Sequence, residues 1–266
     1  MTAHSTRSSR RRALGQHFLR DAGIARAIVD LVAPAERDVV VEIGPGEGAL
    51  TAELARRPAP VTALEVDRAL VPRLRERFPG VEVLEADARE WDYAALRAEP
   101  GGRVLVVGNL PYSVGTRILL ALVQAHGAIA EMALMLQREV AERVAAPPGG
   151  KAYASLSILC QLHWDVCIAL RVPPGAFRPP PEVESAVLHL RALAGPRVAL
   201  ADERRFEAVV RAAFAQRRKM LANALSGGLG IPTESAREAA EAVGIDPRRR
   251  AETLSISEFA SLAGRL

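Results

Sequence analysis

The segment Asn109-Leu110-Pro111-Tyr112 carries residue types suited to methylation of an aromatic amine. The side-chain oxygen of Asn109 and a backbone carbonyl held by the Pro111 turn are two acceptors that can bind one –NH2 group. Two acceptors on one amine draw its lone pair out of conjugation and direct it at an electrophile. Tyr112 adds a flat face on which a base can stack. The alternative is a tight turn with a buried tyrosine.

A glycine turn, Gly44-Pro45-Gly46-Glu47-Gly48, follows an apolar run at residues 38–43. Glycines let the backbone turn sharply and approach a ligand, and the helix N-terminus that follows attracts a carboxylate or phosphate. Because structural turns also collect glycine, this signal is weak by itself. Pro45 stands between the glycines and the full G-x-G-x-x-G pattern is absent, which favours another adenosine ligand over a dinucleotide.

Two carboxylates follow the next two apolar runs. Glu65 lies 19 residues beyond Gly46, where an acid can accept both hydroxyls of a ribose. The alternative is a solvated acid at a strand end. Asp87 could reach the exocyclic amine of an adenine, or it could cap the following turn. With the glycine turn, these acids indicate an adenosine-containing ligand.

Alternating strands and helices must position these residues. Apolar runs typical of buried strands cover 38–43, 61–66, 81–86, 103–107 and 132–136, and helical patterns cover 21–32, with Asp21 as N-cap, and 116–125. Such alternation indicates a parallel sheet covered by helices on both faces. Ligands bind beyond the carboxyl ends of strands in sheets of this kind, and every polar residue singled out above falls at such an end.

The pattern changes in the later part of the chain. Residues 154–170 are apolar and indicate a helix followed by a strand, and prolines at 173–174 and 179–181 bracket a rigid loop. Residues 185–190 indicate a last strand. Beyond Gly195-Pro196 only helical segments remain, at 202–215, 218–226, 234–243 and 257–265. We therefore expect a small helical domain at the C-terminal end.

The excess of positive charge lies at one end of the chain. Lys and Arg total 35 and Asp and Glu total 31, giving +4, and the first twelve residues contribute four arginines (Arg7, Arg10, Arg11, Arg12) and no acid. The remainder holds 35 − 4 = 31 bases and 31 acids, so its formal charge is zero. A balanced body argues against coating nucleic acid by charge alone. The arginine cluster suggests a polyanionic partner, with a solubilising tail as the alternative.

Other features limit the compartment and the chemistry. No apolar h-region follows the basic segment, which argues against a secretory signal, and no run reaches the roughly 18 apolar residues of a spanning helix. Cys160 and Cys167 lack C-x-x-C spacing, and the five histidines are unclustered. We expect a buried, reduced cysteine pair, no metal site and a reducing cytoplasm.

Taken in order, these motifs resemble the ribosomal RNA adenine N6-dimethyltransferases. The resemblance begins at Gly15-Gln16-His17-Phe18-Leu19 and includes the glycine turn, the two carboxylates and residues 109–112. It continues through 136–140, 151–153, 172–181, 213–219 and Leu254 after 244–247. It covers nearly the whole chain, and the C-terminal stretches are more similar to the small-subunit (16S) kasugamycin-sensitivity branch than to the macrolide-resistance enzymes that act on 23S RNA.

The resemblance implies a Rossmann-like S-adenosylmethionine-dependent methyltransferase sheet with helices on both faces and a small all-helical C-terminal domain. Residues 1–20 would form a basic arm and cofactor-covering motif, residues 21–195 the methyltransferase domain, and residues 196–266 a helical RNA-binding domain. The family usually has asparagine at His17, so that contact could be made by backbone or imidazole. The residues implied to contact S-adenosylmethionine are His17, Leu19, Gly44, Gly46, Glu65, Asp87 and Asn109.

The implied reaction is methyl transfer to the N6 amine of adenines in ribosomal RNA, most simply dimethylation of two adjacent adenosines near the 3′ end of 16S rRNA during ribosome biogenesis. The target base must leave its stack, which costs a few kcal/mol. Asn109 and the Leu110 carbonyl, in the turn fixed by Pro111, would hold the amine, and Tyr112 and Phe177 would sandwich the base. No general base is required.

The implied partner is 16S rRNA in the small subunit or its precursor, met by a monomeric, cytoplasmic enzyme without metal. Met220 stands where the family often has threonine. The alternatives are an enzyme for 23S RNA or DNA adenine, and a non-catalytic RNA-binding assembly factor. The residues expected to contact RNA are Arg10, Arg11, Arg12, Arg217, Arg218 and Lys219, with the arginines at 248–250 as further candidates.

Overall fold

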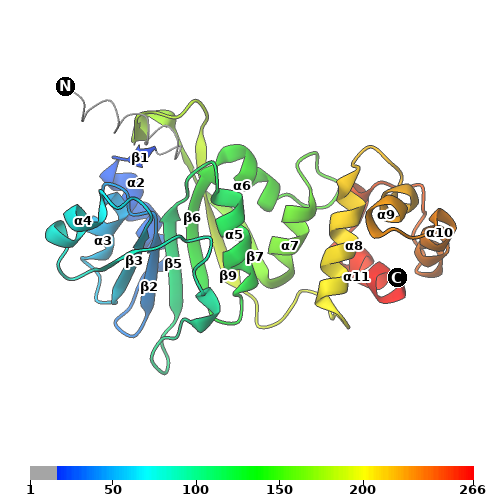
Figure 1. The fold of residues 1–266 in the computed structure, drawn as a ribbon, viewed down its shortest axis with the longest axis horizontal. Helices are drawn as coiled ribbons and strands as arrows, with labels where there is room; N and C mark the ends of the chain where they lie inside the picture. The colour runs from blue at the N-terminus through cyan, green and yellow to red at the C-terminus, as the bar shows by residue number, and fades with distance from the viewer. Residues whose placement is uncertain (1–16) are drawn as a thin grey trace. The chain divides into compact units, whose positions relative to one another are not determined.

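The computed structural model of the chain describes residues 17–266 (Figure 1). Its contacts divide the chain into two compact units. The first contains the residues through Ala141 together with Val166–Ala192, and the second contains Glu142–Asp165 and Leu193–Leu266. The expected boundary at 195 lies close to the division after Ala192, whereas residues 142–165 group with the C-terminal helices. No helix in the described residues combines the length and apolar character needed to cross a membrane.

The first unit is built on a seven-stranded sheet of order β4-β3-β2-β5-β6-β9-β7, most of which can be followed in Figure 1. The five strands from β4 to β6 pair in parallel, and β9 runs antiparallel to β6. The parallel pairing predicted for the first five strands is confirmed, and β9, for which the sequence predicted no direction, is antiparallel. A parallel neighbour needs a long crossover, usually a helix, and β9 is preceded by the proline-rich loop. The strands are β2 (Val39–Ile43), β3 (Val61–Glu65), β4 (Glu82–Glu85), β5 (Val104–Asn109), β6 (Glu131–Gln137), β7 (Trp164–Val172) and β9 (Ser185–Ala192).

The central strands are apolar on both faces. Residues 104–107 of β5 and 132–136 of β6 are all buried, as expected when a sheet is covered on both sides. The side chain of Asp21 accepts a hydrogen bond from the Ile24 amide at 3.0 Å and caps α2, as the sequence predicts. Helix α6 has no counterpart among the predicted elements. The helices in this part of the chain are α2 (Ala22–Val32), α3 (Ala49–Leu54), α4 (Val71–Arg77), α5 (Gly115–Gln124) and α6 (Arg138–Val144).

A second, two-stranded sheet joins the N-terminal segment to the proline-rich loop. Strand β1 (Phe18–Leu19) pairs antiparallel with β8 (Phe177–Arg178), with Leu19 opposite Phe177. The Arg20 amide donates to the Ala176 carbonyl at 2.8 Å, at the end of the 3₁₀ helix η2 (Pro174–Ala176). In Figure 1, β1 lies beyond one end of the large sheet. Residues 17–19, called here the covering segment, are thus held by a loop more than 150 residues away in sequence.

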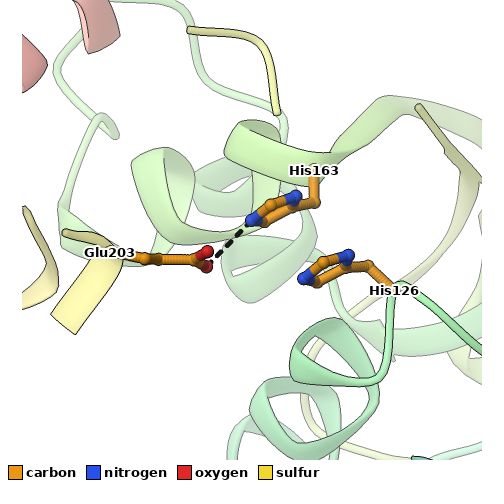
Figure 2. Close-up of side chains that lie close together, drawn as sticks. All are labelled: His126, His163 and Glu203. Atoms are coloured by element: carbon orange, nitrogen blue, oxygen red, sulfur yellow. Dashed lines mark hydrogen bonds and ion pairs between the residues drawn. The ribbon is translucent and has the colours of Figure 1, made fainter. Parts of the chain in front are cut away.

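The second unit is helical, as predicted for the end of the chain. Its helices are α7 (Ser155–His163), α8 (Glu203–Ala215), α9 (Leu221–Leu229), α10 (Thr233–Ala242) and α11 (Ile256–Arg265). Ser255 and Glu258 form a capping box at the start of α11. His163 at the end of α7 bonds to Glu203 at the start of α8, with 2.8 Å between Nε2 and Oε1 (Figure 2). This contact joins two segments of the unit that are distant in sequence.

The two cysteines lie in different environments. Both are free thiols; Cys160 is buried in α7, and burial raises the pKa of its thiol to about 12. Cys167 is exposed on β7, which ends the order of the large sheet. The expectation of a buried pair is therefore wrong for Cys167, because an edge strand leaves alternate side chains uncovered.

Candidate active site

A pocket of about 360 Å³ opens at the carboxyl ends of β2, β3, β4 and β5, entirely within the first unit. The covering segment, the glycine turn (residues 44–48) and the turn after β5 line it. The structure thus brings together residues expected from four strand ends. The predicted site residues in its wall are His17, Leu19, Gly44, Gly46, Glu65, Asp87, Asn109, Leu110, Pro111 and Tyr112.

The backbone of the glycine turn has a conformation that residues other than glycine adopt only with strain. The φ angles of Gly44, Gly46 and Gly48 are 65°, 58° and 83°. A Cβ on Gly46 would lie 2.7 Å from the Phe18 ring, so the turn packs directly beneath the covering segment. The turn therefore needs glycine both for its conformation and for its close approach to Phe18.

Glu65 holds the glycine turn from the end of β3. Its side chain is buried; Oε2 accepts from the Gly46 amide at 3.1 Å, and Oε1 accepts from the Asp67 amide at 2.8 Å. Burial raises the pKa of the Glu65 carboxyl above its usual value, against these two hydrogen bonds. A carboxylate oxygen has more than one lone pair, so Glu65 can also accept from a ligand in the pocket.

Glu42 is a pocket residue that the sequence reasoning missed. It lies in β2 just before the glycine turn and is fully buried, and neither carboxyl oxygen has a hydrogen-bond partner of normal geometry among the described residues. Burial raises the pKa of Glu42 to about 8, with a smaller contribution from the charge of Glu65; the nearby Thr51 hydroxyl and amide act in the opposite direction. The sequence did contain a signal for this residue, which is an acid inside an otherwise apolar strand.

Asp87 follows β4 and is partly committed to its own turn. Its carboxylate accepts from the Arg89 amide at 2.9 Å and from the Arg89 guanidinium. The Arg89 side chain lowers the pKa of Asp87. The side chain nevertheless lines the pocket and is 25% exposed. The structure therefore shows the capping role and leaves the adenine contact a prediction.

The backbone of the covering segment orients Asn109. The Asn109 side-chain nitrogen donates to the His17 carbonyl at 2.9 Å, which leaves Oδ1 as the acceptor of this amide. The Pro111 carbonyl accepts from the amides of Val114 and Gly115 and so opens α5. Because His17 acts here through its carbonyl, this contact does not depend on its departure from the usual asparagine.

Tyr112 is held from two sides. Its ring centroid lies 5.3 Å from that of His17, whose Nδ1 donates to the Pro179 carbonyl at 2.9 Å. Its hydroxyl lies 2.5 Å from the Ser185 hydroxyl on β9. Burial raises the pKa of Tyr112, although the Ser185 hydrogen bond acts against this shift. Ser185 is a second residue that the sequence reasoning missed, because it is 73 positions away.

Phe177 does not line this pocket. It is 5% exposed, belongs to the hydrophobic core of the first unit and pairs with Leu19 across β1 and β8. Its contacts in the structure are those of an apolar anchor for the proline-rich loop.

The predicted RNA-contacting residues fall into two groups. Arg10, Arg11 and Arg12 lie outside the described residues. Arg217 is exposed but donates to the carbonyls of Lys151 and Tyr153, both at 3.2 Å, so it holds a loop of the second unit.

The other cations expected to contact RNA lie on both sides of one chain contact in the second unit. The Leu221 amide donates to the Arg249 carbonyl at 2.7 Å, which brings residues 217–219 next to 248–250. Arg248 pairs with Asp246, and Arg249 with Glu258. Apart from Arg217, three of the cations at 217–219 and 248–250 are exposed and have no acidic partner among the described residues, and they form what we call the basic surface: Arg218, Lys219 and Arg250.

The sheet order, the glycine turn and the pocket at the carboxyl ends of parallel strands define the class of Rossmann-like S-adenosylmethionine-dependent methyltransferases. Among solved structures, a dimethyladenosine transferase from Plasmodium falciparum matches with a TM-score of 0.78 and 23% identity over 92% of this chain and 96% of that chain. The 23S rRNA methyltransferase ErmE matches with a TM-score of 0.69 and 26% identity over 94% and 99%. These similarities confirm the predicted fold class.

Sequence relatives identify the family. The proteins called ribosomal RNA small subunit methyltransferase A from Geobacter metallireducens and Geobacillus thermodenitrificans are 46% and 44% identical, over 95% and 96% of this chain and 94% and 90% of their own lengths. The family model described as Ribosomal RNA adenine dimethylase matches residues 7–266. The chain belongs to the ribosomal RNA adenine dimethylase family. The predicted activity, an S-adenosylmethionine-dependent ribosomal RNA adenine dimethyltransferase, is thereby confirmed.

Proposed function

We propose that this chain dimethylates the N6 amines of two adjacent adenosines near the 3′ end of 16S rRNA in the small ribosomal subunit or its precursor, as a step of ribosome biogenesis in the cytoplasm. The names of the relatives that are 42–46% identical support the small subunit as the substrate. The observation that carries the site assignment is the position of Asn109 and Tyr112 in the same pocket as the glycine turn and Glu65.

The residues around the glycine turn fit S-adenosylmethionine. The positive φ angles and the Phe18 contact at Gly46 leave a backbone cradle that a side chain would fill. The buried Glu65 carboxylate is suited to ribose hydroxyls, and Asp87 is suited to an adenine amine. The covering segment would close over the cofactor through His17 and Leu19. When bound, the cofactor supplies a methyl group on a sulfonium, which is itself the electrophile.

Asn109 supplies one of the two acceptors that the target amine needs. Its nitrogen is engaged by the His17 carbonyl at 2.9 Å, so its oxygen is the atom that can accept from an N6 amine. The Leu110 carbonyl, at the start of the Pro111 turn, is the proposed second acceptor. These contacts contribute by positioning the amine for a direct displacement. The proton of the methylated nitrogen passes to water.

Tyr112 provides the stacking face for the flipped base. Its ring lies in the pocket wall, and its hydroxyl is bound to Ser185. Base–aromatic stacking contributes roughly 1–3 kcal/mol per base, which offsets the few kcal/mol needed to flip an adenine. Phe177, the predicted second stacking residue, is packed in the core and does not line the pocket of this structure.

RNA contacts outside the pocket belong to the basic surface and to the N-terminal arginines. Arg218, Lys219 and Arg250 are exposed, and their charges are not used by acidic side chains of the described chain. We propose the C-terminal helices, residues 196–266, as an RNA-binding domain of a monomeric enzyme.

A labelled-methyl assay tests the proposed function. Purified protein is given unmethylated small subunits, 23S RNA and adenine-containing DNA in separate reactions, and digested products are analysed for dimethyladenosine. We expect transfer to the small subunits alone. Transfer to 23S RNA would replace the proposed substrate, and no transfer to any of the three would favour a non-catalytic RNA-binding assembly factor. Asn109→Ala serves as the inactive control.

A further inference from the structure

We propose that Ser185 is a positioning residue that fixes the ring of Tyr112 for the target adenine. The inference rests on the proposed function, in which Tyr112 stacks on that base. The Ser185 hydroxyl lies 2.5 Å from the Tyr112 hydroxyl. Ser185 itself is not in the pocket wall, so it acts through the tyrosine and not on the substrate.

The sheet gives Ser185 a rigid place. It is the first residue of β9, pairs with Gln137 across the antiparallel ladder to β6, and is fully buried. The Arg138 amide donates to the Glu184 carbonyl at 2.9 Å, which extends this pairing to the residue before Ser185. Tyr112, in contrast, lies in the turn between β5 and α5 and is half-buried. The sheet therefore fixes the position of Ser185, and the hydrogen bond from Ser185 restrains the Tyr112 side chain.

A tether at the hydroxyl controls the whole tyrosine ring. The hydroxyl is the atom farthest from the backbone, so one hydrogen bond there restricts both side-chain torsions. On its other side, the ring faces the His17 imidazole at 5.3 Å, and that imidazole is itself bonded to the Pro179 carbonyl. Without the serine, the hydroxyl loses this hydrogen bond, and the stacking plane offered to the base is less well defined.

The contact is suited to positioning and not to proton transfer. The Tyr112 hydroxyl has only the Ser185 hydroxyl as a hydrogen-bond partner among the described residues, and neither group is a base at neutral pH. Burial raises the pKa of Tyr112 above that of an ordinary phenol, which keeps its proton in place. A misplacement of about 1 Å can lower a rate by up to 10²-fold, so loss of this tether should be visible in kcat.

The test is a double-mutant cycle with Ser185→Ala, Tyr112→Phe and the double variant, assayed on unmethylated small subunits. Each single variant should lose about tenfold in kcat with an unchanged KM for S-adenosylmethionine, and the double variant should lose no more than either single one, because both remove the same hydrogen bond. Ser157→Ala is the matched control: Ser157 is also fully buried, and its hydroxyl donates to the Arg143 carbonyl in the second unit. It should keep the wild-type kcat.

A second measurement does not depend on activity. The chain has three tyrosines, so ring-¹³C tyrosine labelling gives three sets of NMR signals, and Tyr112→Phe identifies one of them. Ser185→Ala should shift the Tyr112 signal and leave those of Tyr93 and Tyr153 in place. If Ser185→Ala does not fold, Tyr112→Phe still tests the inference, because it removes the same hydrogen bond at the half-buried residue. The kcat of this variant should still be lower than that of the wild type.

The outcomes separate the inference from the proposed function. A wild-type protein that methylates no RNA refutes the proposed function, while the NMR shift still reports the tether. An active wild-type protein whose Ser185→Ala variant keeps both its kcat and its Tyr112 signal overturns the inference alone. Losses that multiply in the double variant would also overturn it, since the two side chains would then act separately.

Discussion

Replacement of Asn109 by alanine separates methyl transfer from cofactor binding. In the structure, the side-chain nitrogen of Asn109 bonds to the His17 carbonyl at 2.9 Å and its oxygen remains the acceptor in the pocket. Asn109→Ala removes both. Loss of one preorganised group that acts on the reacting atoms typically lowers kcat by about 10²–10³-fold. We therefore expect methyl transfer to fall by at least this factor.

The effect of Asn109→Ala on the cofactor should be small. The bond that it removes from the covering segment is one neutral hydrogen bond, worth about 1 kcal/mol. Since 1.4 kcal/mol corresponds to tenfold in an equilibrium constant, the Kd for S-adenosylmethionine should rise about fivefold and stay within about tenfold. Glu65, whose oxygens bond to the Gly46 and Asp67 amides, still holds the glycine turn.

Two assays check this separation. Isothermal calorimetry gives the Kd for S-adenosylmethionine, and a single-turnover reaction with labelled cofactor on unmethylated small subunits gives the transfer rate. Glu65→Ala is the contrasting variant and should lose at least tenfold in cofactor affinity, because charge-assisted hydrogen bonds are worth about 1.5–3 kcal/mol. Retained turnover in Asn109→Ala, or a loss of cofactor binding as large as that of Glu65→Ala, would refute the assigned role of Asn109.

Three further predictions concern the pocket residues Gly46 and Glu42 and the cations proposed to bind RNA. Gly46→Ala should lose cofactor binding and melt at a lower temperature, because its Cβ would lie 2.7 Å from the Phe18 ring at a φ of 58°; an unchanged Kd in calorimetry would speak against the cradle. The pKa of Glu42 is raised from 4.5 to about 8, so the stability it contributes is complete below pH 4.5 and is lost as the pH rises through about 8. In urea titrations, Glu42→Gln should flatten the pH dependence of the free energy of unfolding. An unaltered pH profile would contradict the raised pKa of Glu42. Deleting residues 1–12, or replacing Arg218 and Lys219 with alanine, should lower the salt slope of RNA binding by about one for each phosphate that is no longer neutralised, measured by filter binding; a wild-type slope after the deletion would restore the solubilising-tail interpretation.

The local pattern of the chain was sufficient to predict most of its elements. Capping, periodicity and glycine placement act over a few residues. They predict the cap at Asp21, the apolar strands β2 to β6 and the four C-terminal helices. The direction of β9 did not follow from local pattern, because an antiparallel partner is chosen by pairing across the sheet. Residues 142–165 likewise group with the helical unit through distant contacts.

The candidate site shows the same division between what local sequence predicts and what distant contacts decide. The sequence alone determined which residues stand at the strand ends, since the carboxyl ends of parallel strands meet at one edge whatever lies between them. The tertiary structure alone decided how those residues are held. Asn109 is oriented by a carbonyl 92 positions away, and Tyr112 by a hydroxyl 73 positions away.

The tertiary structure also decided which contacts two other predicted residues make. Phe177 is in the core and Arg217 holds a loop, although their residue types fit stacking and phosphate binding equally well. Residue type and spacing report what a side chain can do and where its own element places it. Burial, orientation and hydrogen-bond partners depend on segments that meet only after folding, and for that reason Ser185 emerged from the structure and not from the sequence. Glu42 differs, because its place inside an apolar strand was already visible in the sequence.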